Sequence, residues 1–457
     1  MKKINFGEAI IILVLMLAIL GTGVIGFGLS PQVPVLFVVA LLIAWAKVKK
    51  ATWEKVHDGI TEGITTAIIP IFIFLLIGTL IAVWIKAGII PSLMVFGFNS
   101  LSVKFFVPSA FIVCSLVGLS IGSGFTTIST VGIAILGMGM TMGLDPALVA
   151  GAILSGAIFG DKMSPLSDST NLASAVAGSE LFAHIKNMMW TTIPAFLISL
   201  IGFLALGHAS KAPDMTRVNE TINILEQHFT INWWASLPII LMFVCAWCKI
   251  PAIPTLFINI FVSTVMIFIN EPHFTIKQLA SLVETGFVAQ TKNADVNALL
   301  TRGGISNMMG TVSLIIMTLA LGGLLMKFGI VAAAMDPLAK KLNTPGKLVT
   351  ITICSGIAIN LFVGEQYLSV ILPGRAFKGA FERLKLDPLS LSRVLEDGGS
   401  VINYLIPWGV AGSFAASTLG VSGLAFLPFT LFSLLCPVFW KLCGINGFGL
   451  KWQKKAA

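Results

Sequence analysis

The sequence predicts an all-α polytopic membrane protein with about twelve transmembrane crossings, arranged in two structural repeats with broken helices at the membrane midplane. Three observations lead to this fold class. Hydrophobic residues make up 56% of the 457 residues and charged residues only 11%, whereas soluble domains average about 25% charged residues. Uncharged runs of spanning length recur along the chain, and the pattern of one half returns in the other. The main solvent of this chain is therefore predicted to be lipid.

The predicted spans are apolar runs without charged residues, because a helix that crosses the hydrocarbon core needs roughly 20 such residues. Runs of this kind are Ala9–Leu29, Gly63–Ile85, Asn187–Gly207, Phe229–Cys248, Ile250–Asn270 and Gly303–Met326. Phe105–Leu144 and Gly398–Trp440 are much longer, and each predicts either two helices or one long broken helix.

The second half of the chain resembles the first at an offset of about 240 residues. The matching positions, in the same order in both halves, are Lys86 with Lys327, Cys114 with Cys354, Gly124 with Gly364, Asp145 with Asp387 and Pro165 with Pro407, which places Asp161 opposite Asn403. Many transporters are built from internal repeats. We therefore expect two repeats, inverted by analogy with sodium-coupled transporters. The alternative is that Gly and Pro interrupt helices at similar positions in both halves without any repeat.

These boundaries divide the chain into five parts. We expect two N-terminal transmembrane helices in residues 1–60, the first repeat in 61–207, a linker with two transmembrane helices and polar connections in 208–301, the second repeat in 302–440, and a basic C-terminal tail in 441–457.

A polar segment interrupts the apolar pattern at residues 160–171, where Gly160 and Pro165 oppose a continuous helix. An intramembrane carboxylate needs a functional reason, because a charge at the centre of a bilayer helix costs about 2.5–3.5 kcal/mol on insertion scales. Na⁺ is a hard cation, for which oxygen ligands are favoured. The predicted cation- and proton-binding residues here are Asp161, Ser164, Ser167, Asp168, Ser169, Thr170 and Asn171, with Na⁺ at Asp161 and Asp168. The alternative is an exposed polar loop between two helices.

A second polar cluster follows the apolar run Leu348–Gly364. Glu365 and Gln366 are predicted to take part in cation or proton binding. The only two tyrosines of the chain fall in this region, and the predicted supporting residues are Asn360, Tyr367, Asn403 and Tyr404. Ordinary interfacial placement of Tyr and Glu is the alternative. Glu396 and Asp397 are expected at a helix end and are weaker candidates.

Two further features have open interpretations. Thr126, Thr127 and Ser129 lie midway along a long uncharged run, where they donate ligands or merely bond to their own helix backbone. Lys162 directly follows Asp161, so it either neutralises Asp161 or Asp168 or extends to the membrane interface.

The net charge of +9 comes from Lys and Arg residues in short connections, such as Lys47–Lys55. This distribution is typical of membrane loops with a positive-inside bias and does not indicate nucleic-acid binding. It predicts a cytoplasmic N-terminus.

Two segments, Gly160–Asn171 and Gly364–Arg375, resemble the signature of the NhaC-type Na⁺/H⁺ antiporter family, with Thr301–Gly304 opening a span between them. The resemblance implies a bacterial plasma-membrane antiporter of the ion-transporter superfamily, in which both segments line the transport path. Some relatives resemble malate–lactate exchangers, and no sequence feature separates the two groups.

We hypothesise that Na⁺ and H⁺ compete for one buried carboxylate, Asp161 or Asp168, while one repeat rocks against the other. No phosphate-binding loop, His-Glu-x-x-His motif or Gly-x-Ser-x-Gly motif occurs, so we expect a gradient-driven transporter without a cofactor and not an enzyme. The alternatives are a Na⁺- and H⁺-coupled antiporter of small carboxylates and a cation channel. The lipid bilayer is the expected partner, and the oligomeric state is left open, a homodimer included.

Overall fold

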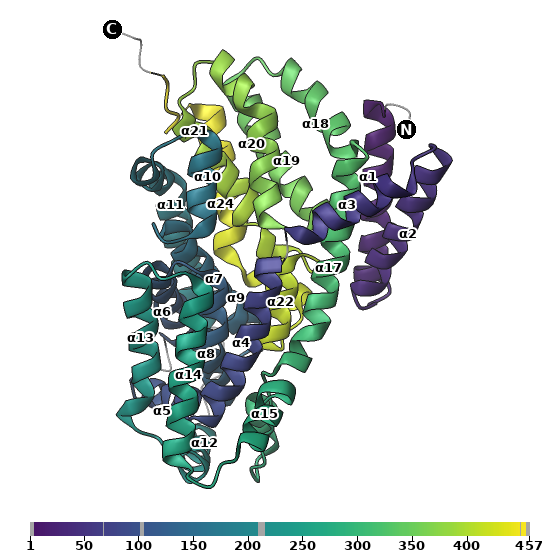
Figure 1. Cartoon of the computed structure of the whole chain (residues 1–457). Coiled ribbons are helices and arrows are strands. Elements are labelled where there is room, and N and C mark those ends of the chain that lie inside the picture. The colour runs from purple at the N-terminus through teal and green to yellow at the C-terminus, as the bar shows by residue number, and fades with distance from the viewer. Residues whose placement is uncertain (1–3, 67, 101–104, 209–214, 448, 454–457) are drawn as a thin grey trace.

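The computed structural model describes residues 4–66, 68–100, 105–208, 215–447 and 449–453, and it is built of helices throughout these ranges (Figure 1). The β-pairing among these residues is confined to two isolated bridges, Phe287 with Arg302 and Leu386 with Trp452. The predicted all-α membrane architecture is confirmed at this level. Lys454 and Lys455 of the predicted basic tail lie outside the described residues.

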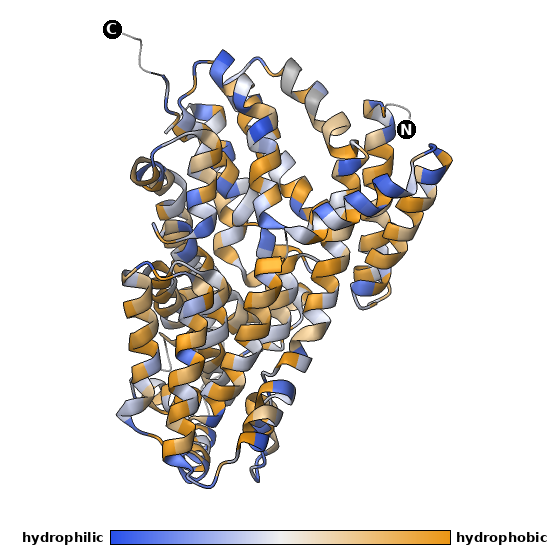
Figure 2. Cartoon of the chain, viewed as in Figure 1, coloured by the Kyte–Doolittle hydropathy of each residue, from blue (hydrophilic) through white to orange (hydrophobic). Residues whose placement is uncertain are grey.

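The N-terminal part is a helical hairpin followed by an amphipathic helix. Its helices are α1 (Phe6–Gly21), which continues into the π-helical turn η1 (Thr22–Gly26), α2 (Gln32–Val48) and α3 (Trp53–Thr65). The hairpin is apolar on its outer faces (Figure 2), as expected for contact with lipid. Asn5 caps α1 by accepting a hydrogen bond from the backbone N–H of Glu8, and Thr52 caps α3.

The first of the two long helical regions runs from α4 to α11. Its elements are α4 (Ile68–Lys86), α5 (Ile89–Ser100), α6 (Phe106–Ile121), α7 (Gly124–Thr127), η3 (Ile128–Gly132), α8 (Ile133–Thr141), α9 (Pro146–Met163), α10 (Asp168–Ala177) and α11 (Leu181–His208).

A connecting region follows, with the elements α12 (Met215–His228), η4 (Trp233–Ser236), α13 (Leu237–Trp247), α14 (Ala252–Asn270), α15 (Ile276–Thr285) and α16 (Ala294–Leu300). In Figure 1, α13 and α14 lie against the α4–α8 part of the first region, and α12 and α15 lie at the lower end of the view.

The second long region completes the chain. It consists of α17 (Ile305–Lys327), α18 (Ile330–Lys341), α19 (Pro345–Val363), α20 (Gln366–Arg383), α21 (Pro388–Leu395), η5 (Glu396–Ser400), η6 (Asn403–Leu405), α22 (Val410–Leu419), α23 (Gly423–Phe426), η7 (Leu427–Phe429) and α24 (Leu431–Asn446).

Eight helices in the described part of the chain are long and apolar enough to cross a membrane, and up to ten spans result if each of two sharply bent helix pairs is one span. The bent pairs are α12 with η4–α13, at 95°, and α22 with α23–η7, at 98°. Four further apolar helices, α2, α5, α6 and α24, have 10–17 residues. The count is below the predicted twelve because breaks in the chain shorten several segments that the sequence pattern counts as full spans.

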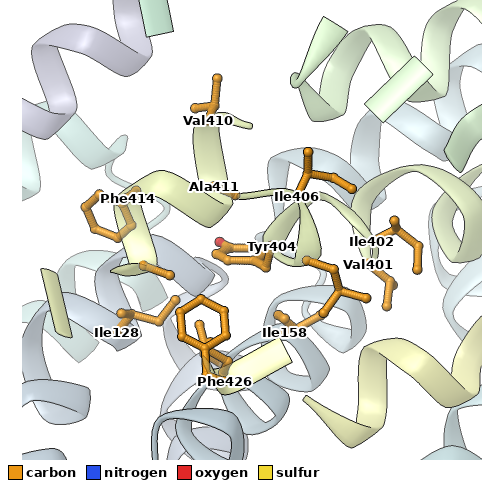
Figure 3. Close-up of a cluster of buried hydrophobic side chains, with 14 of the residues drawn as sticks. Ile128, Ile158, Val401, Ile402, Tyr404, Ile406, Val410, Ala411, Phe414 and Phe426 are labelled. Atoms are coloured by element: carbon orange, nitrogen blue, oxygen red, sulfur yellow. The ribbon is translucent and has the colours of Figure 1, made fainter. Parts of the chain in front are cut away.

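The interior is formed by α8, α9 and α17, most of whose residues are buried, whereas α1, α11 and α14 expose apolar side chains at the periphery. A cluster of buried side chains surrounds Tyr404 where the two long regions meet, and Phe414, Ile128, Ile158 and Phe426 are part of it (Figure 3). The breaks described next lie beside this cluster.

Candidate transport site

Four interruptions of helical structure meet at the junction of the two long regions. Gly122 ends α6 and Gly364 ends α19, both in the left-handed conformation, with φ of 75° and 68°. Glycine is the residue that adopts this conformation without steric cost. The other two interruptions are residues 164–167, between α9 and α10, and residues 406–409, between η6 and α22.

Contacts between these interruptions show that they converge. A Cβ atom on Gly122 would lie 2.9 Å from the Ser164 hydroxyl oxygen, so the first break adjoins the α9–α10 break. The backbone N–H of Val410 donates to the Gly364 carbonyl at 2.7 Å, which joins the other two. A Cβ atom on Gly124 would lie 2.6 Å from the Tyr404 hydroxyl and 3.7 Å from an Asp161 carboxylate oxygen. Both long regions therefore contribute to one central site.

Asp161 occupies the last turn of α9 and faces this junction. Its half-buried carboxylate interacts with the Ser167 hydroxyl and with the backbone N–H of Gly124, near the start of α7. The Tyr404 hydroxyl is close by, is buried, and has no hydrogen-bond partner among the described residues. A carboxylate beside an unpartnered hydroxyl provides oxygen atoms that a small cation can bind.

A chain of hydroxyl groups leads from Asp161 to a second carboxylate. Ser167 Oγ and Ser169 Oγ are 3.1 Å apart, and Ser169 Oγ donates to Glu396 Oε1 at 3.1 Å. Glu396 is fully buried in the π-helical turn η5, and its Oε2 atom has no hydrogen-bond partner among the described residues. π-Helical turns frequently occur at functional sites. From the sequence Glu396 is expected at a helix end and is a weaker candidate. The structure instead buries it and connects it to Asp161 through the hydroxyls of Ser169 and Ser167.

Lys162 forms a buried ion pair with Asp397, the neighbour of Glu396. Both side chains are at most 1% exposed, and the Thr191 hydroxyl donates to the other Asp397 oxygen at 3.0 Å. The two alternatives expected from the sequence, neutralisation of Asp161 or Asp168 and extension to the interface, are both wrong. Sequence spacing could not reveal this partner, because it lies 235 residues away.

Glu365 is buried and serves as the N-cap of α20, where its Oε2 atom accepts a hydrogen bond from the Leu368 N–H at 2.8 Å. Gln366 follows it and is 8% exposed, and its Oε1 atom has no partner among the described residues. Tyr367 is close enough to Glu365, Asp161 and Asp168 to interact with their charges. The structure thus brings Glu365, Gln366 and Tyr367 to the same site as Asp161.

Asp168 begins α10 and is exposed, yet it is near enough to Asp161 for their charges to interact. Asn171 is also exposed, and its amide donates to the carbonyls of Pro165 and Ser167 at 3.0 and 2.7 Å. These residues form the open side of the junction. Asn171 stabilises the broken segment through its amide nitrogen, while Asp168 lies at its mouth.

Several other predicted residues form hydrogen bonds with the backbone or with each other. The Asn360 amide donates to the Gly399 carbonyl at 2.6 Å and accepts from the Asn403 amide at 2.7 Å, and Asn403 accepts from the Ala411 N–H. Hydroxyl groups that donate to backbone carbonyls belong to Thr127, Ser129 and Thr170. The Ser164 hydroxyl accepts from the Leu166 N–H, and Thr126 is buried.

Comparison with known proteins gives a consistent family assignment. The profile of the Na⁺/H⁺ antiporter family matches residues 4–170 and 156–448. The chain is 36% identical to the Na(+)/H(+) antiporter NhaC of Alkalihalophilus pseudofirmus, over all of this chain and 99% of that protein. It is 34% identical to the arginine/ornithine antiporter ArcD of Halobacterium salinarum, over 98% and 93% of the two chains. It is 33% identical to the malate-2H(+)/Na(+)-lactate antiporter of Bacillus subtilis, over 84% and 82%.

Proposed function

Because this chain belongs to the Na⁺/H⁺ antiporter family, a family of transporters and not of enzymes, we propose that it exchanges Na⁺ for H⁺ across the plasma membrane by alternating access. The observation that carries the proposal is the position of Asp161 at the convergence of four chain breaks. Its carboxylate lies beside the hydroxyls of Ser167 and Tyr404, next to a cluster of buried hydrophobic side chains. A carboxylate in this setting binds a proton or a small cation, and each occupant excludes the other.

The two occupants neutralise the same charge, and this gives the exchange its coupling. Burial of an unpaired charge in low dielectric is costly. The conformational change that turns the site from one side of the membrane to the other therefore costs less free energy when Asp161 holds Na⁺ or H⁺ than when its charge is unpaired. Ser167, Tyr404 and the adjoining broken backbone supply further oxygen atoms for Na⁺, and neighbouring Ser169 connects this set to Glu396.

Na⁺-dependent proton movement tests this function directly. Purified protein is reconstituted into proteoliposomes that contain a pH-sensitive dye, and Na⁺ is added outside. We expect proton movement opposite to Na⁺, with a half-saturating Na⁺ concentration that rises as the pH falls, because protons compete for the carboxylate. Na⁺ flux without proton movement would instead indicate a channel.

We also propose that the two long regions are structural repeats, broken near the membrane midplane. The support is a set of corresponding helix ends: left-handed glycines occur at Gly88, Gly122 and Gly178 and again at Gly329, Gly364 and Gly420. Asp145 caps α9 by accepting a hydrogen bond from the Ala147 N–H, and Asp387 caps α21 by accepting one from the Leu389 N–H. Each of the two aspartates directly precedes a proline. Gly364 thus corresponds to Gly122 in this comparison, and not to Gly124 as expected from the sequence.

A second candidate cargo is a small carboxylate, because one relative at 33% identity is named a malate-2H(+)/Na(+)-lactate antiporter. An anionic cargo needs a cation or free N–H groups at the site. Lys162 is paired with Asp397, and the buried Arg393 donates to the carbonyls of Asn187 and Gly449. The positions of these cations favour Na⁺ as the cargo at Asp161. Uptake of labelled malate or lactate by the same proteoliposomes, driven by Na⁺, would overturn this preference.

The orientation remains a proposal based on charge. The basic segment at Lys47–Lys55 follows the first hairpin, so the positive-inside rule places both this segment and the N-terminus in the cytoplasm. Labelling of a single cysteine in the exposed Lys50 position from the two sides of the membrane would test it.

A further inference from the structure

The structure contains a cavity, lined by both polar and apolar side chains, that the described transport site does not include. Its volume is about 470 Å³, and it lies between the turn of the N-terminal hairpin, α17 and the α22–α23 pair. Oxygen-bearing side chains in its wall are Ser30, Gln32, Asn307, Thr311, Ser413, Ser417 and Ser422. The described residues that line it include no charged side chain. Such a wall can accommodate a hydrated cation without binding it tightly.

The inner end of the cavity adjoins the central junction. Leu314 and Thr311 of α17 line the cavity, and one turn further along Thr318 donates its hydroxyl to the Trp408 carbonyl at 3.3 Å. Trp408 belongs to the 406–409 break, and its neighbour Pro407 also lines the cavity. The cavity therefore ends where the broken segments meet.

A group of aromatic rings connects α22, which lines the cavity through Ser413 and Ser417, with Tyr404 beside Asp161. Phe74 stacks on Phe414 with ring centres 4.8 Å apart, and Phe125 packs edge-on against both. Phe125 is also 5.5 Å from the ring of Tyr404, whose hydroxyl lies beside Asp161. Figure 3 shows Phe414 and Tyr404 within this cluster. The rings come from α4, α7, η6 and α22, so a relative shift of these elements would separate them.

The opposite side of Asp161 has a different character. Asp168, Pro165 and Asn171 are all exposed there, whereas Phe74 and Phe414 are at most 1% exposed. From this contrast in exposure we take the α10 side as the open side of the site in this conformation and the α22 side as the closed side. An alternating-access transporter needs a second entrance on the closed side.

We propose that the cavity between α17 and α22 is this second entrance, through which a hydrated monovalent cation reaches Asp161 when Phe74, Phe125 and Phe414 separate. This inference rests on the proposed cation exchange. It identifies the path by which cations move between Asp161 and one side of the membrane. Ala416 lines the same wall between Ser413 and Ser417 and offers a cation no oxygen, so it is a suitable position for a probe.

The test uses Ala416→Cys in the full-length protein with the exposed Cys248 and Cys354 replaced by serine. The probe is the membrane-impermeant cation methanethiosulfonate ethyltrimethylammonium. We expect labelling from one side of the membrane only and a loss of Na⁺/H⁺ exchange of about tenfold, equivalent to roughly 1.4 kcal/mol. Leu424→Cys, at another point of the lining, provides a second probe, and Ile201→Cys on the exposed face of α11 is the matched control that should keep its activity.

Labelling of Ala416→Cys and Leu424→Cys without loss of exchange, or failure of both to react from either side, would overturn the entrance. The background protein is the one in which only Cys248 and Cys354 are replaced by serine. If neither this protein nor the two cysteine variants exchange Na⁺ for H⁺ before labelling, although the variants react with the probe, the proposed function fails instead. The two failures are thus distinguishable.

Discussion

In the repeats that we propose, Asp161 of the first long region corresponds to Asn403 of the second, and the two side chains have different surroundings. Asp161 presents a half-buried carboxylate to the central junction, beside the unpartnered Tyr404 hydroxyl. Asn403 is fully hydrogen-bonded within its own region, to Asn360 and to the Ala411 N–H. We therefore expect the ion to bind at the carboxylate of Asp161, while Asn403 holds the backbone of the second region in place.

The largest expected effect comes from exchanging these two roles. Asp161→Asn should lower Na⁺/H⁺ exchange by at least about 100-fold, a change equivalent to roughly 2.8 kcal/mol, because the amide cannot hold a proton or balance the charge of Na⁺. The double variant Asp161→Asn with Asn403→Asp should not restore exchange in proteoliposomes. Restoration would show that the two positions are interchangeable. Asp145→Asn, an exposed helix cap, is the matched control and should stay within about twofold of the unaltered protein, since an asparagine also caps helices.

The ion pair between the two regions gives the largest expected effect on stability, as distinct from the exchange rate. Lys162→Met leaves Asp397 buried without its partner, and removal of one member of a buried pair typically costs about 3–5 kcal/mol. The melting temperature of the purified protein in detergent should fall markedly. Addition of Asp397→Leu to this variant should recover most of the loss, because the double variant buries no unpaired charge. If the single variant were as stable as the parent, the pair would not join the two regions.

Asp168 and Asp161 offer a smaller contrast within the first region. Because Asp168 is exposed at the mouth of the site, its charge is screened by solvent ions. Asp168→Asn should raise the half-saturating Na⁺ concentration by about threefold, equivalent to roughly 0.6 kcal/mol, with little change in the maximal rate. Initial rates of exchange against Na⁺ concentration measure this. A complete loss of exchange would move Asp168 into the ion-binding set beside Asp161.

Glu365 is expected to show an effect as small as that of Asp168 on a conservative change. Glutamine retains an oxygen that can accept from the Leu368 N–H, so Glu365→Gln should fold normally and lose about threefold in rate, equivalent to roughly 0.6 kcal/mol, through the lost charge. Glu365→Ala removes the cap as well and should cost about 1 kcal/mol of stability. Thermal unfolding and exchange rates of the two variants separate these contributions. Equal rates for Glu365→Gln and the parent would limit Glu365 to its capping role.

Much of the fold could be predicted from composition and pattern. Long uncharged runs have few structural alternatives, because lipid requires every backbone group to be satisfied within the chain. The break between α9 and α10 is also predictable from Pro165, although the expectation that Gly160 interrupts the helix is wrong, because Gly160 lies within α9. The number of spans was harder, because α6 and α24 are shorter than their apolar runs suggest. The sequence pattern does not distinguish a full span from a broken one.

The composition of the site could be predicted only in part. Asp161 and Ser167 were identified because carboxylates and hydroxyls are unusual in an apolar segment. Glu396 and Asp397 were ranked low, because the next apolar run begins directly after them and such acidic residues usually mark the end of a helix in water. Their burial depends on Ser169 and Lys162, which are more than 200 residues away in the chain. Long-range pairing of this kind leaves no local signal.

The position of the Lys162–Asp397 pair has a mechanical consequence. This ion pair joins α9 to η5. Because movement of one past the other would separate two buried charges, we expect α9 and η5 to move together as one body. A second fastening joins α17 to α4, through the hydrogen bond from the Gly304 N–H to the Gly78 carbonyl at 2.7 Å. We call α9 with η5 the first body and α4 with α17 the second. The movement that opens and closes the site is expected between these two bodies. The rings of Phe74 and Phe414 stack there, and such apolar surfaces can separate at little electrostatic cost.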